Sequence, residues 1–168
     1  MSRGNKILLT TEPHGRMEWV IVSGTPKPGT CMELKPATDL GAGNLHTYEP
    51  AGTSAASGSR GMSADGDRIP VAVLLEDELR GKLMTEAYTS GEIGKVYFPI
   101  PGEQLNVLKL DVAGTGDDFT IGDKLMIDDG TGKVLLSSGS IESEPFLSLE
   151  TITDPTADQL VWAQFTGQ

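Results

Sequence analysis

The chain has 168 residues, with 21 glycines, 10 prolines, 5% aromatic residues and a formal net charge of −11 at pH 7. An acidic surface repels phosphate groups, which argues against nucleic-acid binding, and no apolar stretch approaches the roughly 18 residues of a membrane span. The length suits one domain with a buried core, and the composition favours a turn-rich β protein.

Residues 1–15 are predicted to form an extended N-terminal arm. The segment 6–11, Lys-Ile-Leu-Leu-Thr-Thr, has strand character, but Pro13-His14-Gly15 separates it from the next strand. So short a segment has little reason to be ordered unless it pairs with something, such as the edge of a neighbouring subunit.

Residues 16–168 are predicted to form a single β-rich domain that begins with strands at 17–22 and 30–34. A proline-restricted connector joins these strands, and we expect them to form a hairpin-like pair. Both tryptophans, Trp19 and Trp162, lie in apolar strands and are predicted to be core residues. The single cysteine, Cys31, cannot form an internal disulfide and is predicted to be a buried small hydrophobe.

The segment at about 36–68 is rich in Gly, Ala and Ser, and we predict a long flexible loop. Its stretches 41–44 and 51–59 carry almost no side-chain mass to bury. Two interpretations stay open: a tolerated surface insertion, or a contact loop that orders only on assembly.

The densest apolar part of the sequence is 71–105. The run Val71–Leu75 predicts a strand buried on both faces, because it is too short for a membrane span and ends abruptly at acidic residues. Leu79, Leu83 and Ala87 then recur at four-residue spacing, which predicts about two turns of a short helix. A further strand is expected at 96–100.

The remaining chain reads as a run of short strands. The alternation at 105–112 predicts a strand with one well-buried face. The sequence Asp128-Asp129-Gly130-Thr131-Gly132 is the strongest turn signal and predicts a hairpin between strands at 124–127 and 134–136. Strands at 145–152 and 160–165 complete the set. The predicted fold is therefore mainly β, a small barrel or sandwich with one short helix, the arm and the loop.

Motifs for catalysis or cofactor binding do not emerge from the sequence. The acidic pairs at 117–118 and 128–129 lack the alternating ligand spacing of a helix-loop-helix calcium site. The segment 130–133, Gly-Thr-Gly-Lys, lacks the spacing of a phosphate-binding loop. His14 and His46 have no neighbouring Cys or second His. We therefore expect no catalytic residue, no metal, no cofactor and no enzymatic activity.

The order of these elements resembles the capsid decoration, or cement, proteins of tailed bacteriophages. In those proteins an apolar strand is followed by acidic residues, a segment ending in Ala-Tyr, a Gly-Glu turn and a strand leading to Pro-Gly-Glu. The matching positions here are 71–77, 87–88, 91–92 and 96–103. The resemblance continues through 121–125, 129–132 and 147–150, and covers residues 70–165; the first 70 residues match only loosely.

The resemblance implies a small β-barrel protein on the outer capsid surface of a virion, synthesised in the host cytoplasm. Such a protein bridges neighbouring major capsid proteins and stabilises the head against the pressure of packaged DNA. The implied partners are the major capsid protein and further copies of the chain, as a trimer in preference to a dimer, with neither nucleic acid nor membrane. Contacts are expected on the arm and the long loop, at Lys6, Ile7, Leu8, Leu9, Leu45 and Tyr48.

One alternative belongs to another functional class. The chain could be a carbohydrate-binding β module of a phage fibre or a secreted enzyme. Such modules usually display aromatic side chains on a groove, so the low aromatic content weighs against this interpretation.

Overall fold

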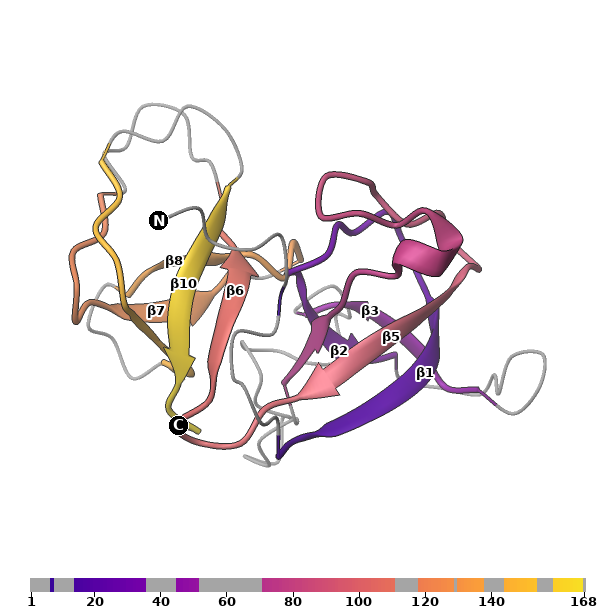
Figure 1. The fold of residues 1–168 in the computed structure, drawn as a ribbon, viewed down its shortest axis with the longest axis horizontal. Coiled ribbons are helices and arrows are strands. Elements are labelled where there is room, and N and C mark those ends of the chain that lie inside the picture. Colours follow the sequence, from indigo (N-terminus) through magenta and orange to yellow (C-terminus); the bar gives the residue numbers. More distant parts are fainter. Residues whose placement is uncertain are drawn as a thin grey trace.

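Ten strands in the described part of the chain form two β units that lie side by side (Figure 1). The computed structural model describes residues 7, 14–35, 45–51, 71–110, 118–128, 130–137, 144–153 and 159–167. The segment 99–103 leads from the last strand of the first unit directly into the first strand of the second unit.

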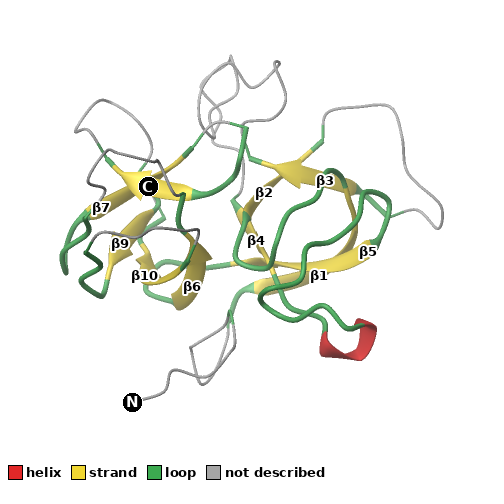
Figure 2. Ribbon diagram, turned by 90° about the horizontal axis from the view of Figure 1, so that it is seen from above, coloured by secondary structure: helices red, strands yellow, loops and turns green. Residues whose placement is uncertain are grey.

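The first unit is a closed five-stranded barrel. Around the barrel the strands follow the order β1 (Arg16–Val22), β3 (Thr47–Pro50), β2 (Cys31–Leu34), β4 (Ala72–Leu74) and β5 (Ile93–Phe98). The strands β1 and β3 pair in parallel at Ile21 and Val22, and the other neighbours are antiparallel. A single turn of 3-10 helix, η1 (Glu78–Arg80), projects from the barrel beside β1 and β5 (Figure 2).

The second unit is an antiparallel sheet in the order β6 (Gln104–Leu108), β10 (Leu160–Phe165), β9 (Phe146–Ser148), β7 (Lys124–Ile127) and β8 (Val134–Leu136). Its two edges approach each other where the Leu110 N–H donates a 2.9 Å hydrogen bond to the Val134 carbonyl. The sheet therefore curls almost into a second barrel, which leaves little open edge.

The strand β4 contributes to two hydrophobic cores at once. Ala72 and Leu74 point into the barrel, among the buried side chains of β1, β2 and β5. Val73 and Leu75 point the other way, into a larger cluster that includes β6, β7 and β10. Successive strand residues face opposite sides, so a strand between two cores needs an uninterrupted apolar run.

Two glycines allow the two units to approach closely. A Cβ atom on Gly132 would lie 2.2 Å from the Cys31 carbonyl oxygen, and one on Gly29 would lie 2.7 Å from the Leu160 side chain. The contact is hydrogen-bonded, because the Cys31 N–H donates to the Gly132 carbonyl at 2.7 Å and the Leu108 N–H to the Gly29 carbonyl at 2.9 Å. The hairpin turn before β8 thus joins the second sheet to the barrel.

Much of the sequence-based prediction is confirmed. The fold is mainly β with a closed barrel, and the predicted strands at 17–22, 30–34, 124–127, 134–136 and 160–165 are present. The predicted hairpin pairs Ile127 with Val134. The run Val71–Leu75 is buried on both faces from Ala72 to Leu75, as predicted, and Val71 is partly buried.

Three predictions about local structure are wrong. The strands β1 and β2 do not pair with each other, because β3 lies between them. That strand falls at 47–50, inside the predicted long loop; the flanking residues 36–44 and 52–70 lie outside the described part. The predicted two-turn helix is only the turn η1, since Leu79 and Leu83 are exposed and have no core to face.

Two burial predictions also fail. Trp19 is predicted to be a core residue but is 46% exposed, whereas Trp162 is half-buried. The strand β6 is predicted to have one well-buried face, but Leu105 to Leu108 are all buried because β6 lies at the junction of the two units. The next residue, Lys109, is also fully buried, with its ammonium 5.0 Å from the ring centroid of Phe119.

Candidate functional site

The titratable side chains of the described residues do not gather into a reaction centre. Within these ranges, no group of three or more His, Cys, Asp or Glu side chains could hold a metal ion. His14 and His46 are exposed, and Cys31 is buried, which raises the pKa of its thiol and keeps it in the unreactive protonated form. The described ranges also contain no helix that is long and apolar enough to cross a membrane.

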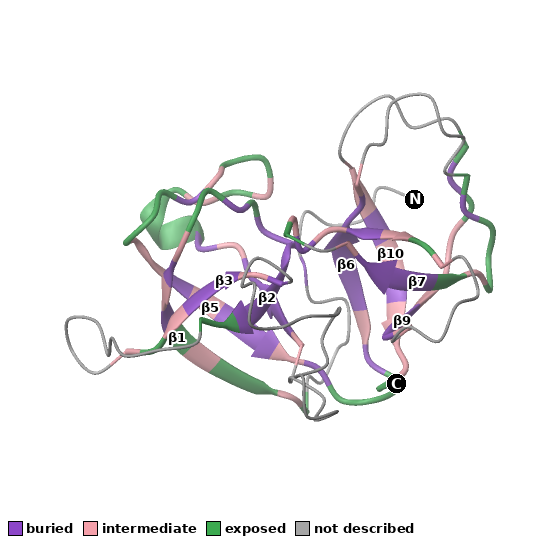
Figure 3. Ribbon diagram, turned by 180° about the vertical axis from the view of Figure 1, so that it is seen from behind, coloured by how far each residue is buried: buried purple, intermediate pink, exposed green. Residues whose placement is uncertain are grey.

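The most exposed aromatic surface lies on the outside of β1. Val20 and Val22 point into the barrel, so Met17, Trp19 and Ile21 point outward. Met17 is 50% exposed and Trp19 is 46% exposed, and their strand runs along the outer rim of the barrel (Figure 3). We call this surface, together with Lys95 and Arg80, the Trp19 face.

Two cations flank the Trp19 ring. Lys95 lies directly across from Trp19 on β5, with its ammonium 4.4 Å from the ring centroid. The Arg80 guanidinium lies 5.3 Å from the same centroid and donates to the Ile93 carbonyl at 3.1 Å, which fixes its position. Cation–π contacts at exposed sites contribute about 0.5–1 kcal/mol each. The Trp19 face is therefore an ordered apolar surface with positive charge at its border.

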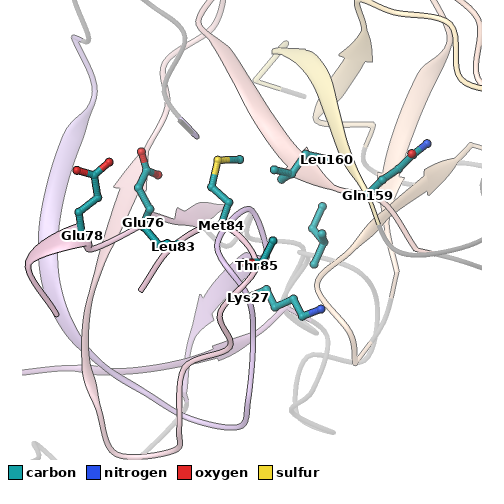
Figure 4. A pocket seen from close by; sticks show the side chains of 9 residues that line it. Lys27, Glu76, Glu78, Leu83, Met84, Thr85, Gln159 and Leu160 are labelled. Atoms are coloured by element: carbon teal, nitrogen blue, oxygen red, sulfur yellow. The ribbon is translucent and has the colours of Figure 1, made fainter. Parts of the chain in front are cut away.

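A hollow of about 400 Å³ opens between the barrel and the second sheet (Figure 4). Glu76 and Glu78 stand on one side of it, Leu160 and Gln159 on the opposite side, and Lys27 lies next to Thr85 between them. Met84 points across the hollow toward Leu160 of the second sheet. The remaining lining residues are Leu83 and Leu108. An apolar floor with a few charged groups around it is a common lining of ligand-binding clefts.

The predicted contact residues fall in different environments. Ile7 and Tyr48 are buried by their own chain, Ile7 at the junction of the two units and Tyr48 inside the barrel, so neither leaves side-chain surface for a partner. Leu45 is half-buried just before β3. Lys6, Leu8 and Leu9 lie outside the described residues.

The segment Pro101-Gly102-Glu103, part of the resemblance described above, has a structural role here. The Glu103 carboxylate accepts hydrogen bonds from four donors: the Tyr97 hydroxyl and the backbone N–H groups of His14, Gly15 and Ile100. Burial opposes ionisation of Glu103, but these hydrogen bonds outweigh it and hold the pKa of the carboxyl group below its usual value. Burial and the Glu103 contact raise the pKa of Tyr97 to about 12. The network fastens the start of β1 to the segment that joins the two units.

No protein-family model matches this chain, and a search of curated proteins finds no significant match.

Sequence reasoning missed the Trp19 face because an aromatic residue in an apolar strand is usually buried, and the polar residues of β1 lie on the other face of the strand. Arg16 and Glu18 share the strand face of Val20 and Val22, where the usual expectation is that polar residues mark the solvent side. At this end of the barrel they are tolerated because they pair with each other at 3.0 Å, and Arg16 also lies 4.6 Å from the Phe98 ring centroid. The sequence signal that indicates the Trp19 face is the alternation of Met17, Trp19 and Ile21, which places them on one side of the strand.

Proposed function

We propose that this chain is a structural protein of a tailed-phage virion that binds the outer surface of the capsid. It bridges neighbouring major capsid proteins and stabilises the head against internal DNA pressure. Its partners are the major capsid protein and further copies of itself, and it performs no catalysis. It is made in the host cytoplasm and resides on the virion.

The observation that carries this proposal is the Trp19 face. Met17 and Trp19 are each about half exposed on a strand whose position is fixed by pairing with β5 along its length. Trp, Tyr and Arg are the side chains that most often dominate binding energy in protein interfaces. A rigid apolar face with cationic neighbours is suited to bind a protein surface, and repetition over a lattice multiplies weak contacts.

The two-unit architecture supports a bridging role. The barrel and the second sheet share one hydrophobic cluster, and hydrogen bonds at Gly29 and Gly132 connect them. A protein that links two capsid subunits must transmit load between its contact surfaces without deforming. Close packing of β units resists such deformation because well-packed cores have low compressibility.

Sedimentation with expanded phage heads that lack their decoration protein tests the proposal. The wild-type chain is expected to co-sediment with the heads and to raise their resistance to heat or chelator. Trp19→Ala should weaken binding at least tenfold, because truncation of a central Trp removes about 2 kcal/mol or more. Ile121→Ala is the matched control, since Ile121 is 69% exposed but lies on the second unit. Absence of wild-type binding to every head tested would contradict the proposal.

The exposure of Trp19 also favours the second candidate, a carbohydrate-binding module. The low aromatic content weighs less against this function once Trp19 is found on the surface. Lys95 and Arg80 lie over its ring, so a sugar would have to displace a cation to stack on the indole. A glycan array separates the two functions: binding to a defined glycan that Trp19→Ala abolishes would favour carbohydrate recognition. An array without hits would leave capsid binding as the better proposal.

A further inference from the structure

The backbone of Ile7 lies beside the second sheet, where its carbonyl accepts a hydrogen bond from β6. The strand β6 is an edge strand whose outer side faces away from β10. The Asn106 N–H on that side donates to the Ile7 carbonyl at 2.8 Å, and the Leu108 N–H donates to the Gly29 carbonyl at 2.9 Å. The backbone of Ile7 therefore occupies a position that a neighbouring strand would take.

Ile7 is held by three separate interactions. Its side chain is fully buried in the larger hydrophobic cluster. Its carbonyl accepts from Asn106, and its N–H lies 3.2 and 3.4 Å from the two carboxylate oxygens of Glu76. We call this arrangement of Asn106, Glu76 and the surrounding apolar cluster the Ile7 slot. Glu76 also lines the hollow of Figure 4, so the slot and the hollow adjoin.

The hydrogen-bond partners of Ile7 are distant from it along the chain. Glu76 is 69 residues away, and Asn106 is further still. The slot is thus formed by the folded body of the protein, and an extended segment from another molecule can make the same three contacts. Exchange of an identical segment between copies is a low-cost route to association, because the contacts are the same in both states.

We propose that the Ile7 slot is a strand-addition site that accepts the N-terminal segment of a second copy of this chain. Charge favours this occupant, since residues 1–11 contain two basic residues, Arg3 and Lys6, and no acidic residue. The side of the hollow next to the slot carries Glu76 and Glu78. At low protein concentration each Ile7 slot holds the Ile7 of its own chain. When copies of the chain are crowded together, the effective concentration of the neighbours' N-terminal segments rises, and this favours exchange.

The test uses the 168-residue chain with the substitution Ile7→Asp. The N-terminal segment of this variant cannot fill the apolar part of the Ile7 slot. A fluorescent peptide of residues 2–12 is titrated into this variant and into the wild type, with binding followed by anisotropy. The peptide is expected to bind Ile7→Asp at least tenfold more tightly than the wild type, whose slot is already filled. The same peptide carrying Ile7→Asp is the matched control and should not bind.

A second variant covers the case in which Ile7→Asp does not fold. Ile7→Ala leaves a smaller cavity, and the wild-type peptide should raise its melting temperature by a few degrees while the Ile7→Asp peptide does not. Sedimentation velocity of the wild type at rising concentration should show a dimer or larger species that the folded Ile7 variant lacks. Failure of the wild-type peptide to bind either folded variant, or equal binding of both peptides, would overturn the proposal. No capsid is present in this test, so its outcome is independent of the proposed function.

Discussion

The Tyr97 hydroxyl donates a 2.6 Å hydrogen bond to Glu103 Oε1, between two side chains that are both almost fully buried. Tyr97 lies on the last barrel strand, and Glu103 immediately precedes the first strand of the second unit. The Gly15 N–H donates to the Tyr97 hydroxyl oxygen at 2.8 Å, so the start of β1 belongs to the same network. This pair therefore links the start of the barrel, its last strand and the second sheet.

Replacing Glu103 should destabilise the protein more than replacing Tyr97. Glu103→Gln puts an NH₂ group among four donors, and we expect a loss of about 2–3 kcal/mol in the free energy of unfolding, because hydrogen bonds to buried charged groups contribute most. Tyr97→Phe leaves the three backbone donors in place and should cost about 1–2 kcal/mol. Urea unfolding followed by circular dichroism measures both, and equal stability of Glu103→Gln and wild type would contradict the role of the network.

The stability advantage of Glu103 over a glutamine at the same position should disappear in acid. The folded-state pKa of Glu103 lies below its ordinary value, so its ionised form contributes stability above about pH 4.3, the usual glutamate pKa. That contribution is lost as pH falls through the folded-state pKa. The difference in unfolding free energy between wild type and Glu103→Gln is therefore expected to be constant from pH 7 to about 5 and to shrink below about 4. A difference that grows in acid would show that the sign is wrong.

The two glycines of the hairpin turn should differ sharply in their tolerance of alanine. Both have positive φ, +64° at Gly132 and +87° at Gly130, but only Gly132 has neighbours within reach of a new Cβ atom. Gly130→Ala should cost about 1–2 kcal/mol for the left-handed backbone alone. Gly132→Ala adds a clash with the Cys31 carbonyl and should cost about 3 kcal/mol or more. Thermal and urea unfolding measure the loss of stability in each variant. Similar losses in both would mean that the contact between Gly132 and Cys31 does not hold the barrel and the second sheet together.

The Cys31 thiol should be inert in the folded protein. It is fully buried, and burial raises its pKa, so the thiolate that reacts with disulfide reagents is scarce at pH 8. Labelling with Ellman's reagent is expected to be negligible in native buffer and to reach one thiol per chain in denaturing urea. Rapid stoichiometric labelling of the native protein would contradict the burial of β2 against the second sheet.

The local sequence pattern predicted the strands and turns that are determined by residues close together in the chain. Gly130 and Gly132 help to form the hairpin between β7 and β8 because glycines at positive φ permit a tight reversal. The predicted segment 160–165 coincides with β10. The strand β3 escaped prediction because it is only four residues long and is flanked by Gly, Ala and Ser, and its pairing comes from β1 and β2.

The candidate site, like the fold, could be predicted from the sequence only in part. The sequence predicts contact residues on the arm and the loop, whereas the side chains of Ile7 and Tyr48 are buried in their own chain. The sequence predicts a core position for Trp19 because an aromatic residue in an apolar strand is usually buried. Whether the outer face of β1 is covered depends on which segments of the chain pack against it, which is a property of the whole fold.

The sequence by itself determined the class of the protein: acidic, turn-rich and mainly β, with a strand at 71–75 that needs apolar surroundings on both sides. These features follow from side-chain alternation and turn chemistry, which act over a few residues. The tertiary structure decided that Val73 faces the second sheet while Leu74 faces the barrel, that Glu103 fastens the junction, and that Ile7 is buried while Trp19 is exposed. Those outcomes depend on contacts between residues far apart in the chain, and such contacts form only when the strands have taken their order in space.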